Sequence, residues 1–271
     1  MSVRHLSFLP DLSVVVPAYN EAARILPPLH RLARYLDSHG APYEILVVDD
    51  GSRDGTAAAV ERFRAGCPAV RLIRLPANQG KGAAVRKGML EANGRLQLFT
   101  DADGATPIEE LWRLEQAVID GADLAIGSRT LASRDPRYTV RARWHRSVLG
   151  ALFNMLVRRA GIAGIADTQC GFKLFRRSVA RDLFSVASID GYGFDLELLY
   201  VAQRRGYRIA EVPVNWADQP GSKVRVLRDG LRMVRDLFAI RRNDAQGRYA
   251  PTESLPHAAE VVLSHPGSPP S

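Results

Sequence analysis

The sequence predicts one α/β domain in which a mostly parallel sheet is covered by helices on both faces. Short runs rich in Val, Ile and Leu alternate with helical patterns through the first half of the chain. These runs are apolar almost without interruption, as in strands that are buried on both faces. With 271 residues, the chain is long enough to bury the core of one large α/β domain.

Five strands and four helices are predicted in the first half. The strands have a β-branched composition and cover residues 13–19, 43–52, 70–76, 95–100 and 122–129. The helices cover residues 21–38, 53–66, 82–92 and 111–121. The second helix begins near Asp54 and stops at Gly66, because Asp favours helix starts and Gly favours helix ends. Ligands of such sheets bind beyond the carboxyl ends of the strands.

The second half is less regular and ends in a polar tail. Residues 134–161 mix seven arginines with apolar residues and predict helices. A polar loop with a strand (167–177), a helix (194–206), a strand (207–216) and a last helix (224–242) are expected to follow. We therefore expect a leader over residues 1–10, one domain over 11–242 with halves 11–130 and 131–242, and a disordered tail over 243–271.

The chain is basic, with a formal net charge of +8 and a pI near 9.9. Such a surplus indicates an anionic partner, namely nucleic acid, an acidic lipid surface or a phosphorylated substrate, although a solvated arginine-rich surface has the same composition. Nucleic acid is disfavoured, because the sequence has neither a known binding module nor aromatic residues interleaved with its arginines.

Cysteine content and hydropathy bear on the compartment. Cys67 and Cys170 are the only cysteines, which supports neither a disulfide framework nor a zinc site and fits a reducing cytoplasm. No stretch reads as a signal peptide, and the longest apolar run, residues 147–157, is shorter than the roughly 18 residues of a membrane span. We expect a cytoplasmic protein.

Polar clusters follow three of the predicted strands. The clusters are Tyr19, Asn20 and Glu21 after the first strand, Asp49 and Asp50 at the end of the second, and Asp101 and Asp103 at the end of the fourth. Because parallel strands end at the same edge of a sheet, at least three carboxylates should converge on one cleft. Their repulsion must be offset by a cation or by hydrogen-bond donors of a ligand.

The spacing of Asp101 and Asp103 suits a divalent cation. Both side chains point the same way if the segment is extended. Carboxylate oxygens are hard ligands for Mg²⁺ or Mn²⁺, which also bridge substrate phosphates. The pair alone would read as a turn or a helix cap, since Asp-Gly and Thr-Pro favour turns. The neighbouring Asp49 and Asp50 favour the metal site.

Several motifs resemble those of family 2 glycosyltransferases of the GT-A fold, which is Rossmann-like. They are, in order, VVVPAYNEA, VVDDGSRDGT, NQGKGAAVRKGM, TDADGATP and GSR. The later DTQCGFKLF, FDLELLYVAQRRGYRIAEVPVNW and GSK resemble dolichyl-phosphate β-glucosyltransferases, with polyprenyl-phosphate mannose synthases as near relatives. The resemblance covers residues 11–241, nearly all of the chain that is expected to be ordered.

The resemblance implies an inverting hexosyltransferase that moves glucose from UDP-glucose to a polyprenyl phosphate and uses Mg²⁺ or Mn²⁺. Mannosyl transfer from GDP-mannose, transfer to a soluble hydroxyl acceptor, and a nucleotide-sugar sensor without turnover remain open alternatives. A phosphate monoester is largely ionised near neutral pH, because its second pKa is about 6, and needs no strong base. An alcohol acceptor would need a general base, for which Asp195 and Glu197 are the late acidic candidates.

The resemblance also assigns residues to the donor. The nucleotide sugar would contact Pro17, Ala18, Tyr19, Glu21, Asp49, Asp50, Lys81, Asp101 and Asp103. Asp101 and Asp103 would also hold the metal, with Asp103 as its main ligand and a catalytic residue. Tyr19 could instead pack beneath the sheet, and Lys81 could be a solvated residue at a helix start.

Further residues are assigned to the acceptor and the sugar. The acceptor phosphate would contact Arg129, Arg143, Ser147 and Lys223, and the sugar pocket would contain Asp167, Thr168 and Gln169. Arginine suits phosphate because the guanidinium group binds it in a bidentate manner. Ala105 stands where the mannose synthases have a Gln metal ligand, which favours the glucosyltransferase branch and leaves the coordination shell open.

The last predicted helix has the pattern of a helix that lies on a membrane surface. Its apolar face contains Val224, Leu227, Leu231, Val234 and Phe238, and Arg225, Arg228, Arg232 and Arg235 border that face. A helix packed on the core with exposed arginines is the alternative. With a lipid acceptor, we expect peripheral association with the cytoplasmic face of the membrane.

Overall fold

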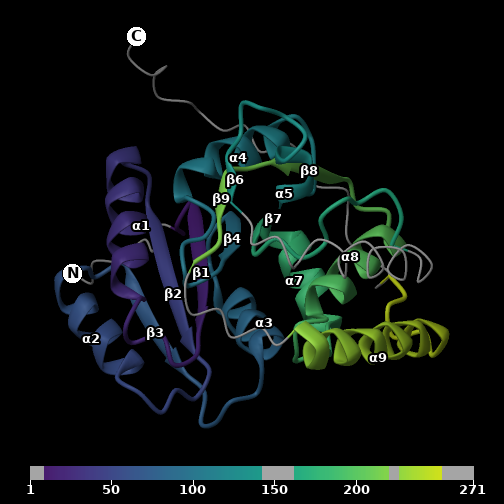
Figure 1. Ribbon diagram of the computed structural model, residues 1–271, viewed down its shortest axis with the longest axis horizontal. Coiled ribbons are helices and arrows are strands. Elements are labelled where there is room, and N and C mark those ends of the chain that lie inside the picture. The colour runs from purple at the N-terminus through teal and green to yellow at the C-terminus, as the bar shows by residue number, and fades with distance from the viewer. Residues whose placement is uncertain (1–8, 142–161, 220–225, 252–271) are drawn as a thin grey trace, which may run out of the picture.

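A computed structural model describes residues 9–141, 162–219 and 226–251 (Figure 1). These residues form a seven-stranded sheet with the strand order β3-β2-β1-β4-β7-β5-β8. Its strands are β1 (Leu12–Ala18), β2 (Tyr43–Asp49), β3 (Val70–Arg74), β4 (Leu96–Thr100), β5 (Leu124–Ser128), β7 (Phe172–Arg176) and β8 (Ile209–Pro213). Neighbouring strands are parallel except where β7 is inserted between β4 and β5. The mostly parallel sheet predicted from the sequence is confirmed.

Helices follow most of the strands. They are α1 (Leu26–His39), α2 (Thr56–Gly66), α3 (Lys81–Glu91), the 3-10 turn Ile108–Glu110, α4 (Leu111–Ile119), α5 (Arg129–Ala132), α7 (Arg177–Val186), α8 (Phe194–Arg204) and α9 (Val226–Ala245). A two-stranded ribbon joins β6 (Val140–Arg141) to β9 (Trp216–Ala217). In Figure 1, α1 and α2 lie at one end of the molecule, and α8 and α9 lie at the other.

The alternation of side chains along β1 divides the core into two layers. Val15 belongs to the layer that contains buried residues of α3, α7, α8 and α9. Val14 and Val16 point to the opposite face, where buried residues of α1, α2 and α4 complete the second layer. Every residue of β1 is buried, as expected for a strand that helices cover on both faces.

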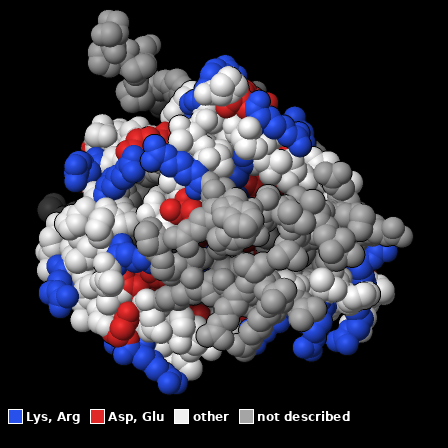
Figure 2. Space-filling view, viewed as in Figure 1, with Lys and Arg blue, Asp and Glu red and all other residues white. Residues whose placement is uncertain are grey.

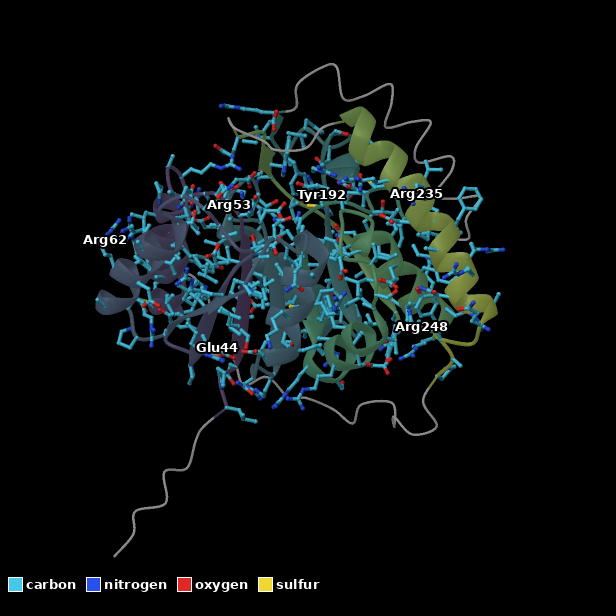
Figure 3. All side chains as sticks on the ribbon, turned by 90° about the horizontal axis from the view of Figure 1, so that it is seen from below. Glu44, Arg53, Arg62, Tyr192, Arg235 and Arg248 are labelled. Carbon is cyan, nitrogen blue, oxygen red and sulfur yellow. The ribbon has the colours of Figure 1, made fainter. Side chains whose placement is uncertain are left out.

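The parallel strands bring the polar sequence clusters to one edge of the sheet. β1 pairs with β2 and β4 in parallel, so all three strands end on the same side. Figure 3 shows the polarity: Glu44, near the start of β2, lies on one side of the molecule, and Arg53, which follows the end of β2, lies on the other with Tyr192 and Arg235.

The ordered chain continues past residue 242, where the composition predicted the domain to end. α9 runs to Ala245, and Tyr249 is fully buried. The Tyr249 hydroxyl donates to Glu197 Oε1 at 2.6 Å and accepts from Asn243 Nδ2 at 3.0 Å. A buried tyrosine with a hydroxyl partner anchors this segment. The proposed leader up to residue 8 and the tail from residue 252 lie outside the described residues.

The last helix packs on the core through residues outside the apolar face that was expected to lie on a membrane. Met233, Leu237 and Ile240 are buried, whereas Phe238 is 73% exposed. None of the described helices is long and apolar enough to cross a bilayer. Figure 2 shows the described Lys and Arg spread around the rim of one face with Asp and Glu among them, without a single basic patch among these described residues.

A buried ion pair joins β7 to α8. The Lys173 side chain is inaccessible to solvent and donates to Asp195 Oδ1 at 2.6 Å and to the Cys170 carbonyl at 2.7 Å. Asp195 is in the first turn of α8 and is also buried. Two charges without access to water are tolerated only when they are paired in this way.

We predict that Lys173→Met lowers the free energy of unfolding by about 3–5 kcal/mol, because Asp195 is left as an unpaired buried charge. Lys173→Met combined with Asp195→Leu should recover most of the loss. Urea denaturation measures both values. Lys87→Met, at a half-exposed position of α3, is the control and should change stability by less than about 0.5 kcal/mol. Equal losses in Lys173→Met and Lys87→Met would contradict the prediction.

Candidate functional site

A cleft of about 780 Å³ opens at the edge where β1, β2 and β4 end. Its walls come from the loop after β1, the loop before α3, the loop after β4, the loop before α8, and α9. The predicted donor residues that line it are Pro17, Ala18, Tyr19, Glu21, Asp50, Lys81, Asp101 and Asp103. Figure 3 shows Tyr192 and Arg235, from the α8 and α9 walls, on the same side of the molecule.

Asp50 holds the loop that leads into α3. Its Oδ1 accepts from the Gln79 backbone at 2.7 Å, and its Oδ2 accepts from the Gly80 backbone at 2.9 Å and from Asn78 Nδ2 at 2.8 Å. Burial raises the pKa of Asp50 above its ordinary value, although these donors oppose the shift. Asp50 therefore shapes a wall of the cleft as well as facing it.

Asp49, the other carboxylate at the end of β2, faces elsewhere. It is 1% exposed and its Oδ1 accepts from the Ser52 backbone at 3.1 Å. This contact stabilises the turn after β2, and Asp49 is not among the residues that line the described cleft. Of two adjacent aspartates, one faces the cleft and the other supports its loop.

The Asp-x-Asp pair follows β4 directly. Asp103 Oδ1 accepts from the Ala105 backbone at 3.0 Å, and Gly104 has the positive φ of 65° that this turn requires. Burial and then the charge of Asp101 raise the pKa of Asp103. Both aspartates line the cleft, so two carboxylates are held close together in a partly buried place.

Gly171 gives the Asp101 carboxylate its room. The Asp101 backbone donates to the Gly171 carbonyl at 3.1 Å. A Cβ at position 171 would overlap the Asp101 carboxylate, so any larger residue would displace that side chain. The CGF segment of the second half is therefore part of the Asp101 environment.

Lys81, the first residue of α3, pairs with Asp101. Its Nζ lies 2.6 Å from Asp101 Oδ1, and the lysine side chain is 23% exposed. The ammonium also lies 5.3 Å from the centre of the Phe99 ring and 5.9 Å from that of Tyr192. Burial by itself would lower the pKa of Lys81, but the charges of Asp101 and Asp195 and the hydrogen bond to Asp101 together outweigh it and the pKa is raised.

Glu21 and Arg24 form a second ion pair on the cleft wall. Arg24 donates to both oxygens of Glu21, with Nη2 at 2.9 Å from Oε1. The carboxylates of Glu21, Asp103 and Asp101 raise the pKa of Arg24 and keep it charged. The positive charge of Arg24 therefore interacts with Glu21 and also with the Asp101–Asp103 pair.

Arg129, predicted to contact phosphate, forms a bidentate ion pair with Asp167. Its Nε and Nη2 donate to the two Asp167 oxygens, each at 2.7 Å, and its backbone donates to Asp167 Oδ2 at 2.9 Å. The guanidinium lies 5.4 Å from the centre of the Trp216 ring. Arg129 was predicted to contact the acceptor phosphate and Asp167 to line the sugar pocket. The structure pairs these two residues with each other.

The neighbours of Asp167 face inward. Thr168 is 3% exposed, and its hydroxyl has no hydrogen-bond partner among the described residues. Gln169 Nε2 lies 3.3 Å from the Met233 sulfur of α9. The remaining predicted acceptor residues, Arg143, Ser147 and Lys223, lie outside the described residues.

Both acidic residues of the FDLE segment are engaged inside the protein. Asp195 is paired with Lys173. Glu197 accepts from the Ser188 and Ile189 backbones, each at 2.8 Å, and from the Tyr249 hydroxyl. These contacts tie the start of α8 to the segment after α9.

Within the described residues, no group of three or more His, Cys, Asp or Glu is arranged to hold a metal. The acidic residues that line the cleft are Glu21, Asp50, Asp101, Asp103 and Asp236, and Asp101 and Asp103 are two residues apart in the chain. Both cysteines are free, in agreement with the sequence analysis.

Comparison with known proteins identifies the family. The sequence profile of glycosyl transferase family 2 matches residues 13–184. The chain is 42% identical over 243 residues to a dolichyl-phosphate β-glucosyltransferase of Drosophila melanogaster, covering 85% of this chain and 74% of the relative. It is 38% identical over 242 residues to the Homo sapiens dolichyl-phosphate β-glucosyltransferase, with 85% and 75% covered. The chain belongs to glycosyltransferase family 2.

Solved structures agree with this fold. Glucosyl-3-phosphoglycerate synthase of Mycobacterium tuberculosis matches with a TM-score of 0.61 at 22% identity, covering 90% of this chain and 82% of that one. The same synthase in complex with Mn²⁺, UDP and phosphoglyceric acid matches with a TM-score of 0.59 at 23% identity, covering 90% and 80%. The glycosyltransferase described here has the GT-A fold, as its sequence motifs predicted.

The last helix of this glycosyltransferase, α9, was not expected to line the cleft. Arg232, Arg235 and Asp236 line the cleft. The pKa of Asp236 is raised by burial and by Glu197, although it accepts a hydrogen bond from the Gly193 backbone. The i, i+3 spacing of the two arginines could have predicted that they share one face of the helix.

We predict that Asp50→Asn loosens the loop before α3, because an amide group presents an NH₂ to donors that the carboxylate had accepted. Hydrogen exchange at the Gln79 and Gly80 amides should accelerate about ten-fold or more, since an unsatisfied buried donor costs about 1–3 kcal/mol. Glu61→Gln, on the exposed side of α2, should leave both rates unchanged. Native exchange rates in Asp50→Asn would show that the carboxylate does not hold the loop.

Proposed function

We propose that this family 2 glycosyltransferase transfers glucose from UDP-glucose to a polyprenyl phosphate, with inversion at the anomeric carbon. Relatives that are 36–42% identical are dolichyl-phosphate β-glucosyltransferases by name. The observation that carries the proposal is the convergence of Asp50, Lys81 and the Asp101–Asp103 pair on one large cleft at the carboxyl edge of the sheet. This is the edge at which α/β proteins bind nucleotides.

Different residues of the cleft are assigned to different parts of the nucleotide sugar. We assign the base and ribose to Pro17, Ala18, Tyr19, Glu21 and Asp50, all on the β1 and β2 side of the cleft. Lys81 supplies positive charge for the diphosphate. Asp49 acts through the turn that it stabilises rather than through direct contact.

The carboxylates of Asp101 and Asp103 fit a divalent cation such as Mg²⁺ or Mn²⁺. Both present hard oxygen ligands, and burial and then the charge of Asp101 raise the pKa of Asp103, so that a cation would stabilise its ionised form. Gly171 keeps room beside the Asp101 carboxylate. When bound, the metal acts as a Lewis acid that stabilises the departing diphosphate. Two protein ligands suffice where substrate phosphates complete the shell.

A phosphate acceptor agrees with the state of the acidic residues. An alcohol acceptor needs a carboxylate that is free to take its proton, but Asp195 is paired with Lys173 and Glu197 accepts several hydrogen bonds. An ionised phosphate oxygen can attack the anomeric carbon without a base, forming the new bond as the bond to the diphosphate breaks. Asp195 then serves as a positioning residue for α8.

The acceptor phosphate needs positive charge near the metal. Arg232 and Arg235 project from α9 into the cleft, and both side chains are exposed. We assign the acceptor phosphate to these arginines in addition to Arg129, Arg143, Ser147 and Lys223. The Arg129–Asp167 ion pair orients the segment 167–169, which we assign to the sugar.

We further propose that the protein is cytoplasmic and binds the cytoplasmic face of the membrane peripherally. A polyprenyl chain stays in the bilayer, so the enzyme must bind its phosphate at the membrane surface. Phe238, 73% exposed on the arginine-bearing helix α9, supports contact with lipid near the cleft.

A donor-by-acceptor screen tests the proposed reaction. UDP-glucose or GDP-mannose is combined with undecaprenyl phosphate, dolichyl phosphate or a water-soluble alcohol, and sugar in the lipid fraction is measured. We expect transfer of glucose from UDP-glucose to a polyprenyl phosphate with Mg²⁺ or Mn²⁺, and none with EDTA. Asp103→Ala should lower the rate at least about 100-fold, because metal stabilisation contributes several kcal/mol. Transfer to the alcohol alone would overturn the proposal.

We predict that Arg232→Gln with Arg235→Gln raises the KM for polyprenyl phosphate about ten-fold or more, because each charge-assisted hydrogen bond contributes about 1.5–3 kcal/mol. Steady-state kinetics with saturating UDP-glucose measures the change. Arg242→Gln, in the last turn of α9 away from the cleft, is the matched control and should keep the native KM. An unchanged acceptor KM in the double variant would remove α9 from the acceptor site.

A further inference from the structure

We propose that Lys81 occupies the place of a cation beside Asp101 until the nucleotide arrives, so that the divalent metal and the nucleotide bind cooperatively. The inference rests on the proposed function, in that it assumes a metal-assisted nucleotide-sugar donor. It concerns the order of events in the cleft before any sugar is transferred. The residues that carry it are Lys81, Asp101 and Asp103.

The contact between Lys81 and Asp101 is close and enclosed. Lys81 Nζ lies 2.6 Å from Asp101 Oδ1, and only 23% of the lysine side chain is exposed. The rings of Phe99, Tyr192 and Phe194 surround the ammonium at 5.3–6.0 Å from their centres. A shielded ion pair is screened less by salt than a surface pair, so it competes effectively for the carboxylate.

The backbone on both sides of Lys81 is fixed. Gly80 donates to Asp50 Oδ2 at 2.9 Å, and Gly82 donates to the Asp190 carbonyl at 2.7 Å. A Cβ at Gly80 would overlap the Asp190 carbonyl oxygen, and a Cβ at Gly82 would overlap the Ile189 carbonyl oxygen, which shows how closely this loop packs. Lys81 can therefore leave Asp101 only by moving its side chain.

Lys81 takes Asp101 Oδ1, so a metal could reach only Asp101 Oδ2, where the neighbouring ammonium repels it and weakens its binding. While Lys81 remains in place, Asp103 is the one member of the pair without a lysine partner, and its Oδ1 already accepts from Ala105. No cluster of three or more His, Cys, Asp or Glu within the described ranges could replace Asp101 as a ligand. The protein without nucleotide should therefore bind a divalent metal weakly.

A diphosphate changes the balance. Its oxygens offer Lys81 another anionic partner inside the same cleft, and they also complete the oxygen shell of the metal. Release of Asp101 by Lys81 and capture of Asp101 by the metal then occur together. Linkage requires the effect to be mutual: nucleotide strengthens metal binding by the same factor as metal strengthens nucleotide binding.

The test measures Mn²⁺ binding to the full-length protein by electron paramagnetic resonance, with and without UDP. For the native protein we expect weak Mn²⁺ binding alone and at least about ten-fold tighter binding with UDP, a coupling of ordinary size between two sites. For Lys81→Met we expect Mn²⁺ to bind about ten-fold more tightly than in the native protein without UDP, because Asp101 is released. The gain on adding UDP should shrink accordingly.

The controls separate this effect from a general change of charge. Lys87→Met removes the same side chain from the same helix, where it pairs with Glu91 at 2.7 Å rather than with Asp101, and should retain native Mn²⁺ binding. Lys81→Gln repeats the experiment with a polar side chain in case the methionine variant does not fold. Thermal unfolding by circular dichroism verifies each variant.

Two outcomes overturn the inference. One is Mn²⁺ binding in folded Lys81→Met or Lys81→Gln that is unchanged or weaker without UDP. The other is a native protein that binds UDP equally well with and without Mn²⁺. Neither outcome depends on the acceptor or on the sugar, so glucosyl transfer in the donor-by-acceptor screen would stand. Conversely, failure of the lipid acceptor in that screen would leave the Mn²⁺ and UDP linkage intact.

Discussion

The gathering of negative charge at one edge of the sheet is the constraint on which the rest of the molecule depends. Parallel pairing of β1, β2 and β4 makes this convergence unavoidable, and each carboxylate is offset differently. Backbone amides surround Asp50, an ammonium meets Asp101, and Asp103 has an amide and the field of Arg24. The loops before α3 and after β4 are therefore held in shape by hydrogen bonds to the carboxylates of Asp50 and Asp103.

The second half of the chain packs against this edge of the sheet through β7 and the segment before it. β7 enters the sheet in the antiparallel sense between β4 and β5, which places Gly171 against Asp101 and buries Lys173 beneath the cleft. Asp195 and Glu197 then fix the start of α8, and Tyr249 ties α8 to the end of α9. These contacts and the buried Met233, Leu237 and Ile240 hold α9 on the core, and Arg232 and Arg235 of this helix line the cleft.

Local patterns predicted the sheet, its helical cover and the polar strand ends that now line the cleft, because side-chain alternation and strand ends follow directly from residue order, whereas Pro17, Ala18 and Lys81 were expected only from the family resemblance. They could not separate Asp49 from Asp50, since only the register of the turn decides which one faces the cleft. Nor could they pair Arg129 with Asp167, or place Gly171 beside Asp101, because these contacts join segments far apart in the chain. The apolar stripe of the last helix was ambiguous, as several of its faces carry apolar residues.

The way in which Asp50 holds its loop has a consequence for redesign. Gln79 is held through its backbone amide, and it is an exposed residue among those that line the cleft. Gly80 has a φ of 112° and no room for a Cβ, so its identity is fixed. Position 79 is therefore a place where new side chains can be presented to a nucleotide without disturbing the loop that carries them. Libraries that seek altered base preference have a natural starting point there.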